Sequence, residues 1–215
     1  MIVDARMERI GKNIFRIFRL TAVLALFAAL SPGPEFRPAH ISAFAANVAA
    51  LSGDLRIVIQ KSRYVLTLYK GMTPVKSYWA AFGKGYRGGD KRRKGDKRTP
   101  EGEFYICTIN HSKRFYKFLG LSYPGVSHAN NALESGIITP REYDAIKKAH
   151  EERRQPPWET RLGGAVGIHG RIADAAVRRL PDPLNWTDGC IALNNEDVDE
   201  IYSVVSFGTP VIIVP

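Results

Sequence analysis

The 215-residue sequence is poor in cysteine: it has only Cys107 and Cys190, and no pair at CxxC spacing. Two cysteines exclude a disulfide-rich scaffold, and the absence of closely spaced ligands argues against a zinc site. The sequence also lacks an uncharged apolar run of the ~20 residues that span a membrane, and it lacks internal repeats. With 45% hydrophobic and 24% charged residues, its composition is that of an ordinary globular protein.

The amino-terminal segment has the pattern of an export signal. Three basic residues between positions 12 and 19 precede the apolar run Leu20–Leu30, and Pro32 interrupts the segment soon afterwards. A positive segment followed by ~7–15 apolar residues is typical of secretory signals, and Ala43–Ala45 has the A-x-A form of a cleavage site. We predict that residues 1–45 are a signal peptide or, if uncleaved, an N-terminal membrane anchor. Residues 46–215 then form one folded domain in the periplasm or cell envelope.

The positive charge is concentrated in one segment. The formal net charge is +10, and the stretch Lys84–Arg98 contains eight basic residues against only two acidic ones, Asp90 and Asp96. Four glycines and few apolar side chains predict that this stretch is a flexible, solvated loop. Because the rest of the domain is close to neutral, the chain lacks the broad basic surface typical of nucleic-acid-binding proteins, and we expect no nucleic-acid partner.

Alternating apolar residues and turn signals predict more strands than helices. Thr139, Pro140 and Glu142 form the N-terminal capping pattern of a helix that would extend to about Arg154, whereas 122–136 has no regular pattern. The predicted fold class is mainly β with flanking helices, as a mixed β-sheet or sandwich. A second helix is predicted over Glu196–Val205, and the predicted strands are 56–61, Tyr64–Tyr69, Val75–Gly83, Glu103–Asn110, Gly164–His169, Cys190–Leu193 and Thr209–Val214.

Cys190 and His169 fit a nucleophile and its general base. A free thiol titrates near ~8.5, so a cysteine nucleophile needs a neighbouring base at neutral pH, and histidine is the usual one. Gly189 would allow a tight turn that directs backbone N–H groups at the oxyanion of an attacked carbonyl. Composition alone favours the alternative that Cys190 is a small buried core residue, because a lone cysteine is more often a core residue than a nucleophile.

Three motifs in order resemble the L,D-transpeptidase catalytic domain family, of the YkuD type, which acts on bacterial cell walls. They are Thr99-Pro100-Glu101-Gly102-Glu103-Phe104, Ile168-His169-Gly170, and Thr187-Asp188-Gly189-Cys190-Ile191-Ala192-Leu193-Asn194. The final Gly208-Thr209-Pro210-Val211 is similar to the family's closing strand, so the resemblance extends over about residues 55–215 and implies a YkuD-like fold.

The resemblance implies a mechanism. Cys190 would attack the carbonyl between the third residue and D-Ala of a peptidoglycan stem tetrapeptide, giving a thioester that an amine of a second stem resolves. His169 would be the general base and acid, Gly170 would orient its ring through the backbone carbonyl, and Gly189 would lie in the oxyanion region. No cofactor and no metal are implied.

Position 188 departs from the family pattern, which has histidine where this chain has Asp188. The departure leaves three outcomes open: transpeptidation, hydrolysis (carboxypeptidase activity or release of a murein-linked lipoprotein), and a non-catalytic wall-binding module. We expect Asp188 to point away from the sulfur toward backbone amides or an arginine such as Arg171. Arg171, Trp186, Asp188 and His128 are the candidate substrate-binding residues, with His128 in a loop beside the groove. The basic loop 84–98 would attract carboxylate-bearing peptidoglycan.

Overall fold

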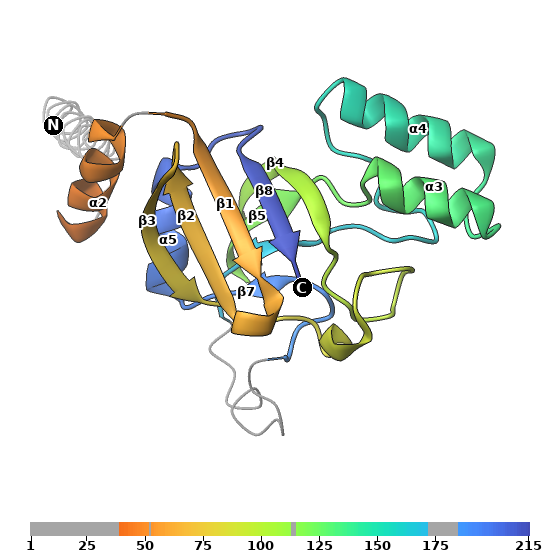
Figure 1. Cartoon of the computed structure of the whole chain (residues 1–215), viewed down its shortest axis with the longest axis horizontal. Helices are drawn as coiled ribbons and strands as arrows, with labels where there is room; N and C mark the ends of the chain where they lie inside the picture. The colour runs from red at the N-terminus through yellow and green to blue at the C-terminus, as the bar shows by residue number, and fades with distance from the viewer. Residues whose placement is uncertain (1–38, 52, 113–114, 172–184) are drawn as a thin grey trace, which may run out of the picture. The chain divides into compact units, whose positions relative to one another are not determined.

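The computed structural model describes residues 39–51, 53–112, 115–171 and 185–215 (Figure 1). No helix within these residues is long and apolar enough to cross a membrane. Eight strands form one mixed sheet in the order β3-β2-β1-β8-β4-β5-β6-β7. Their bounds are β1 Leu55–Gln60, β2 Val65–Lys70, β3 Thr73–Trp79, β4 Gly102–Ser112, β5 Tyr116–Leu121, β6 Gly167–His169, β7 Ile191–Ala192 and β8 Pro210–Val214.

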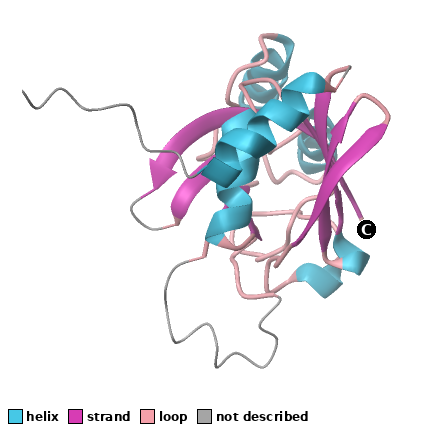
Figure 2. Ribbon diagram, turned by 90° about the vertical axis from the view of Figure 1, so that its left-hand side faces the viewer, coloured by secondary structure: helices cyan, strands magenta, loops and turns pink. Residues whose placement is uncertain are grey.

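The first three strands form an antiparallel meander, and the closing strand lies at the centre of the sheet. β8 pairs in parallel with β1, with Ile57 opposite Val211, and antiparallel with β4, with Phe104 opposite Val211. Alternate residues of these strands, such as Ile57, Ile59 and Val211, are fully buried. Their apolar faces form the main core, and the predicted fold class is confirmed. Figure 2 shows the strands in two groups at the right and upper left, because the sheet curls.

Four α-helices flank the sheet: α2 Ala39–Ala50, α3 Val126–Glu134, α4 Pro140–Glu151 and α5 Asn195–Val204. The capping prediction for α4 is confirmed. Thr139 Oγ1 accepts a hydrogen bond from Glu142 N, and the Glu142 carboxylate accepts one from Thr139 N. The prediction that 122–136 is irregular is wrong, because α3 occupies most of it and packs on α4 through Ala129, Ala132 and Ile146.

Helix α2 crosses the boundary that the sequence suggested at residue 45. Val48 is buried in the main core, and Phe44 packs against the core from the same helix. Residues 43–45 of the A-x-A pattern are therefore helical in the full-length chain. The apolar run Leu20–Leu30 lies outside the described residues, and the export signal stays a prediction.

The prediction of a solvated loop over 84–98 agrees with the structure, since most of its basic side chains are exposed, but the loop is also built around two aspartates and one of its lysines is buried. Lys91 is buried and forms an ion pair with Asp96 at 2.6 Å. Asp96 also accepts hydrogen bonds from the backbone N–H groups of Arg92, Arg93 and Arg98. Burial acts to raise the pKa of Asp96, but these bonds outweigh it and the pKa is lowered. The loop also contains the 3₁₀ turn η2 (Tyr86–Gly88).

Candidate active site

Two short strands bring the histidine and cysteine motifs to one cavity. β6 ends at His169 and pairs in parallel with β7, with His169 opposite Ala192, and Cys190 directly precedes β7. Leu193 N also donates to His169 O at 2.9 Å. Cys190 and His169 both line a cavity of about 610 Å³. The loop 84–98 forms another part of its wall through Lys84, Lys94 and Lys97.

Gly170 O and two aromatic rings contact the imidazole of His169. Its Nδ1 lies 2.7 Å from Gly170 O. A carbonyl oxygen only accepts, so Nδ1 carries the proton and Nε2 has the lone pair of the neutral ring. The ring centroid lies 4.4 Å from that of Phe115 and 5.8 Å from that of Trp186. His169 is 1% exposed, so its tautomer and orientation are fixed by the protein rather than by solvent.

The turn before Cys190 is closed by the hydroxyl of Thr187. Thr187 Oγ1 donates to Cys190 O at 2.7 Å and accepts from Gly189 N at 3.1 Å. The Gly189 N–H is therefore already engaged, and it can serve an oxyanion only if the Thr187 bond opens. The sulfur of Cys190 is half-buried and donates to Ala165 O at 3.6 Å.

Two glycines allow the loop 84–98 to pack directly on this turn. Gly189 has φ +131°, a conformation that favours glycine, and a Cβ there would lie 2.7 Å from Arg98 O. A Cβ on Gly83 would lie 2.1 Å from Lys97 O and 2.9 Å from Gly189 Cα. Backbone segments at 83, 97–98 and 189 are thus in contact, and the loop is part of the support of Cys190.

The predicted substrate-binding residues divide into two pairs. Trp186 and Asp188 line the cavity with Cys190, whereas neither Arg171 nor His128 is among its lining residues. Asp188 is 72% exposed, and its nearest cationic partner is Lys84, with 3.8 Å between Nζ and Oδ1. The expected partner Arg171 is thus replaced by a lysine of the basic loop. The Trp186 indole Nε1 is buried and has no hydrogen-bond partner within the described parts of the chain.

His128 lies in α3 and not in the loop that the sequence suggested. It is buried and contacts the Asp90 carboxylate at 3.2 Å through Nε2. The two residues line a separate cavity of about 360 Å³ that Cys190 does not reach. Burial of Asp90 acts to raise its pKa, but hydrogen bonds from His128 and from the N–H of Glu101 and Lys91 lower it.

The second cysteine has different surroundings. Cys107 lies in β4, is 8% exposed, and burial raises the pKa of its thiol to about 12. No disulfide joins Cys107 to Cys190. No group of three His, Cys, Asp or Glu side chains suited to a metal ion occurs in the portions of the chain that the structure describes.

Sequence reasoning missed several cavity residues. Thr187 lies inside the quoted motif, so its hydroxyl could have been considered as the group that closes the turn. Phe115, Ala165 and Lys97 carry no local signal, because the folding of distant segments brings them to the cavity.

The family model described as the L,D-transpeptidase catalytic domain (YkuD) matches residues 54–213. A search of curated proteins finds no match. The helical cell shape determining protein Pgp2 from Campylobacter jejuni is 17% identical with a TM-score of 0.50, over 80% of this chain and 54% of that one. An L,D-transpeptidase from Xylanimonas cellulosilytica is 12% identical with a TM-score of 0.44, over 77% of this chain and 62% of that one. The chain therefore covers less than two thirds of each of these two structures.

Proposed function

The chain belongs to the L,D-transpeptidase catalytic domain family, and on that basis we propose that it is an exported, cysteine-dependent peptidoglycan L,D-transpeptidase acting on stem tetrapeptides. The observation that carries the proposal is the shared cavity of Cys190 and His169, with the imidazole Nδ1 bound to Gly170 O. This hydrogen bond leaves Nε2 as the basic nitrogen, which is the protonation state that a general base requires.

In the first step, His169 Nε2 takes the proton of the Cys190 thiol, and the thiolate attacks the carbonyl carbon of the third stem residue. The C–N bond to D-Ala breaks, its electron pair goes to the nitrogen, and that nitrogen takes the proton from Nε2. D-Ala leaves and a thioester remains. The backbone N–H of Cys190 stabilises the oxyanion in this proposal, since the Gly189 N–H is bound to Thr187.

In the second step, an amine of another stem peptide gives a proton to Nε2 and attacks the thioester carbonyl. The C–S bond breaks, the thiolate is restored, and a cross-link between two third residues is formed. Asp188 helps to bind the acceptor stem peptide in this proposal, because its exposed carboxylate at the cavity wall attracts an ammonium group of that peptide. Trp186 packs against the His169 ring and forms the cavity wall on that side. Arg171 and His128 have no role here.

The alternative outcome is hydrolysis, in which water replaces the acceptor amine. The open cavity and the exposed Asp188 favour access of water to the thioester. The same chemistry would release a lipoprotein linked to the third stem residue. Peptidoglycan stem peptides are the partners in all of these proposals. A murein-linked lipoprotein is a partner only if the chain releases such a lipoprotein.

Mass spectrometry of purified disaccharide tetrapeptides incubated with the full chain tests the function. Transpeptidation predicts D-Ala and cross-linked dimers, both absent with Cys190→Ala. Tripeptides without dimers would assign carboxypeptidase activity instead. Unchanged substrate with the wild-type chain, or turnover by Cys190→Ala, would overturn the cysteine mechanism. Fractionation of cells, with and without residues 1–45, tests export.

A further inference from the structure

The lysine side chains of the loop 84–98 make one wall of the cavity positively charged. Lys84, Lys91, Lys94 and Lys97 all line it. Three of them already have a carboxylate partner: Lys84 lies 3.8 Å from Asp188, Lys91 lies 2.6 Å from Asp96, and Lys94 lies 3.4 Å from Glu159. No carboxylate of a described residue lies within ion-pair distance of Lys97. Lys97 is therefore the cation of this wall whose charge remains available to a ligand.

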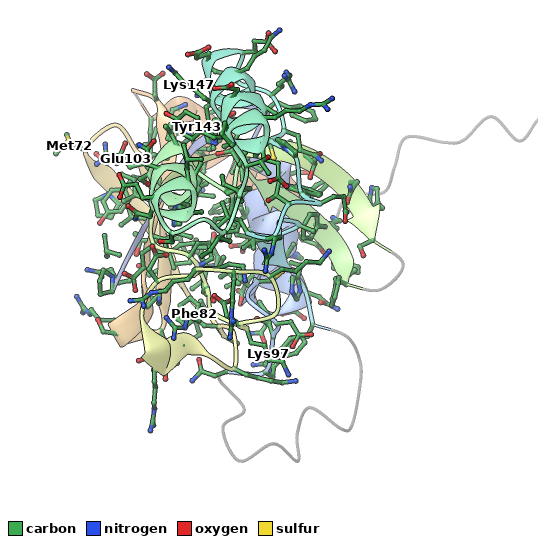
Figure 3. All side chains as sticks on the ribbon, turned by 90° about the vertical axis from the view of Figure 1, so that its right-hand side faces the viewer. Met72, Phe82, Lys97, Glu103, Tyr143 and Lys147 are labelled. Carbon is green, nitrogen blue, oxygen red and sulfur yellow. The ribbon has the colours of Figure 1, made fainter. Side chains whose placement is uncertain are left out.

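The backbone of Lys97 is held in an uncommon conformation beside the nucleophile. Its φ is +57°, in the left-handed region that residues other than glycine rarely adopt. Its carbonyl accepts a hydrogen bond from Gly85 N at 2.8 Å and packs against Gly83, which in turn contacts Gly189. Such strain persists where surrounding structure enforces it, and it is concentrated at functional sites. Figure 3 shows Lys97 in the lower part of the view, below Phe82.

Ala165, which also lines the cavity, has a similar backbone conformation. Its φ is +52°, and its carbonyl accepts the hydrogen bond from the Cys190 sulfur. Two strained residues thus line the one cavity that contains Cys190 and His169. One holds the nucleophile, and the other extends an unpaired ammonium group from the loop that supports the nucleophile.

We propose that Lys97 is a specificity-determining residue that binds a carboxylate of the peptide donor in the Cys190 cavity. This inference rests on the proposed function and deepens it. Lys97 is exposed at the cavity wall, so its ammonium group can reach a bound ligand, and a positive charge there favours an anionic ligand group over its neutral amide. Two carboxylates of a stem tetrapeptide present the same chemistry: the side-chain carboxylate of a diamino acid at position three, and the terminal carboxylate of D-Ala. Lys97 discriminates the free acid from the amide at one of them.

The test measures binding of three peptides by calorimetry, in the full chain with Cys190→Ala so that no peptide is consumed. One tetrapeptide carries both carboxylates, one is amidated at the third-residue side chain, and one is amidated at the terminus. Adding Lys97→Gln should raise Kd of the peptide that carries both carboxylates about tenfold, which corresponds to the loss of one charged hydrogen bond. For the peptide amidated at the recognised carboxylate, Lys97→Gln should leave Kd unchanged, and this pattern identifies the carboxylate.

Two further variants control for charge and for folding. Arg93→Gln removes one positive charge from the same loop, but Arg93 is exposed and is not among the residues that line the cavity, so Kd should change less than twofold. Lys97→Arg keeps the charge and should restore most of the affinity. Glutamine and arginine have the same backbone preference as lysine at a positive φ, so unfolding temperatures should stay equal.

The inference is overturned if Lys97→Gln changes Kd of all three peptides equally, if it changes none, or if no peptide binds. Failure of the proposed function is a different result, because it appears as an absence of turnover by the wild-type chain. Carboxylate discrimination at Lys97 is read from binding alone and does not depend on that outcome.

Discussion

The two cysteines occupy regions that differ in every property that governs a thiol. Cys107 lies within a long strand, is buried, and has a pKa raised to about 12. Cys190 lies at the end of a glycine turn, is half-buried, and shares a cavity with His169. A thiol needs an accessible sulfur and a base to be a nucleophile, and Cys107 lacks the first. The comparison teaches that the turn around residues 187–190 makes the difference, rather than the presence of cysteine.

The largest effect should come from removing the sulfur of Cys190, with removal of the Cys107 sulfur as the comparison. Cys190→Ala should lower kcat for D-Ala release by at least about 10³-fold, because the covalent step has no other nucleophile. Cys107→Ala should leave kcat within a factor of about two, since burial keeps this thiol protonated and away from substrate. Both variants are measured by the rate of D-Ala release from tetrapeptides. Equal losses in the two variants would remove the functional difference between the cysteines.

The next largest effect should come from adding one methyl group to the turn. A Cβ at Gly189 would collide with Arg98 O and would require a side chain at φ +131°. Gly189→Ala should therefore displace Cys190 and lower kcat/KM about 100-fold, the cost of a displacement of about 1 Å. Gly136→Ala is the matched control, because Gly136 also has a positive φ of +65° but has nothing within 4 Å of its Cβ position. Unchanged kcat/KM in Gly189→Ala would mean that the turn geometry is not required.

A smaller effect should come from breaking the ion pair between Lys91 and Asp96, which lies in the loop that packs on the turn. Asp96→Asn leaves Lys91 buried without its partner, which should lower the free energy of unfolding at pH 7 by about 3 kcal/mol. The folded-state pKa of Asp96 is lowered, so its contribution is complete above the unfolded pKa of about 3.9 and is lost as the pH falls through the folded pKa.

The difference in unfolding free energy between wild type and Asp96→Asn should therefore narrow below about pH 4. Urea unfolding at pH 7 and at pH 3 measures it. A difference that stays constant with pH would show that the carboxylate charge of Asp96 does not stabilise the loop.

The smallest effect should be structural and confined to Cys107. Cys107→Ala should lower the free energy of unfolding by about 1 kcal/mol, the usual cost of a small loss in a core.

Alkylation of the native chain by iodoacetamide at pH 8 should modify Cys190 and leave Cys107 unmodified until the chain unfolds, since the thiolate fraction of Cys107 at that pH is very small. Peptide mapping reads both sites, and rapid native labelling of Cys107 would contradict its assignment as an inert core residue.

Local patterns were enough to predict much of the fold. The alternation in β1 and β2, the closing strand β8 and the Thr139 capping box depend on neighbouring residues, and the structure agrees with each. Helix α3 was missed because its N-cap is Gly125, with no side-chain cap, and its sequence VSHANNALE has few apolar residues. Helix α2 was missed because the amino-terminal segment was assigned to export.

The candidate site was predictable only in part. Cys190, His169 and Gly170 lie in short motifs that can be recognised directly in the sequence. The partner of Asp188 and the position of Lys97 depend on how the loop 84–98 folds onto residues 187–190, and that folding depends on buried contacts of Asp96 and Gly83. Charge density predicted the solvated loop, but it does not reveal that Asp96 pairs with the buried Lys91.

The intact mass of the protein, mixed briefly with a disaccharide tetrapeptide and quenched in acid, tests the central claim most directly. The account predicts an adduct equal to the muropeptide minus D-Ala, located on the tryptic peptide that contains Cys190 and released by hydroxylamine, as a thioester is. The same adduct on Cys107, or D-Ala release with no covalent intermediate at Cys190, would contradict it.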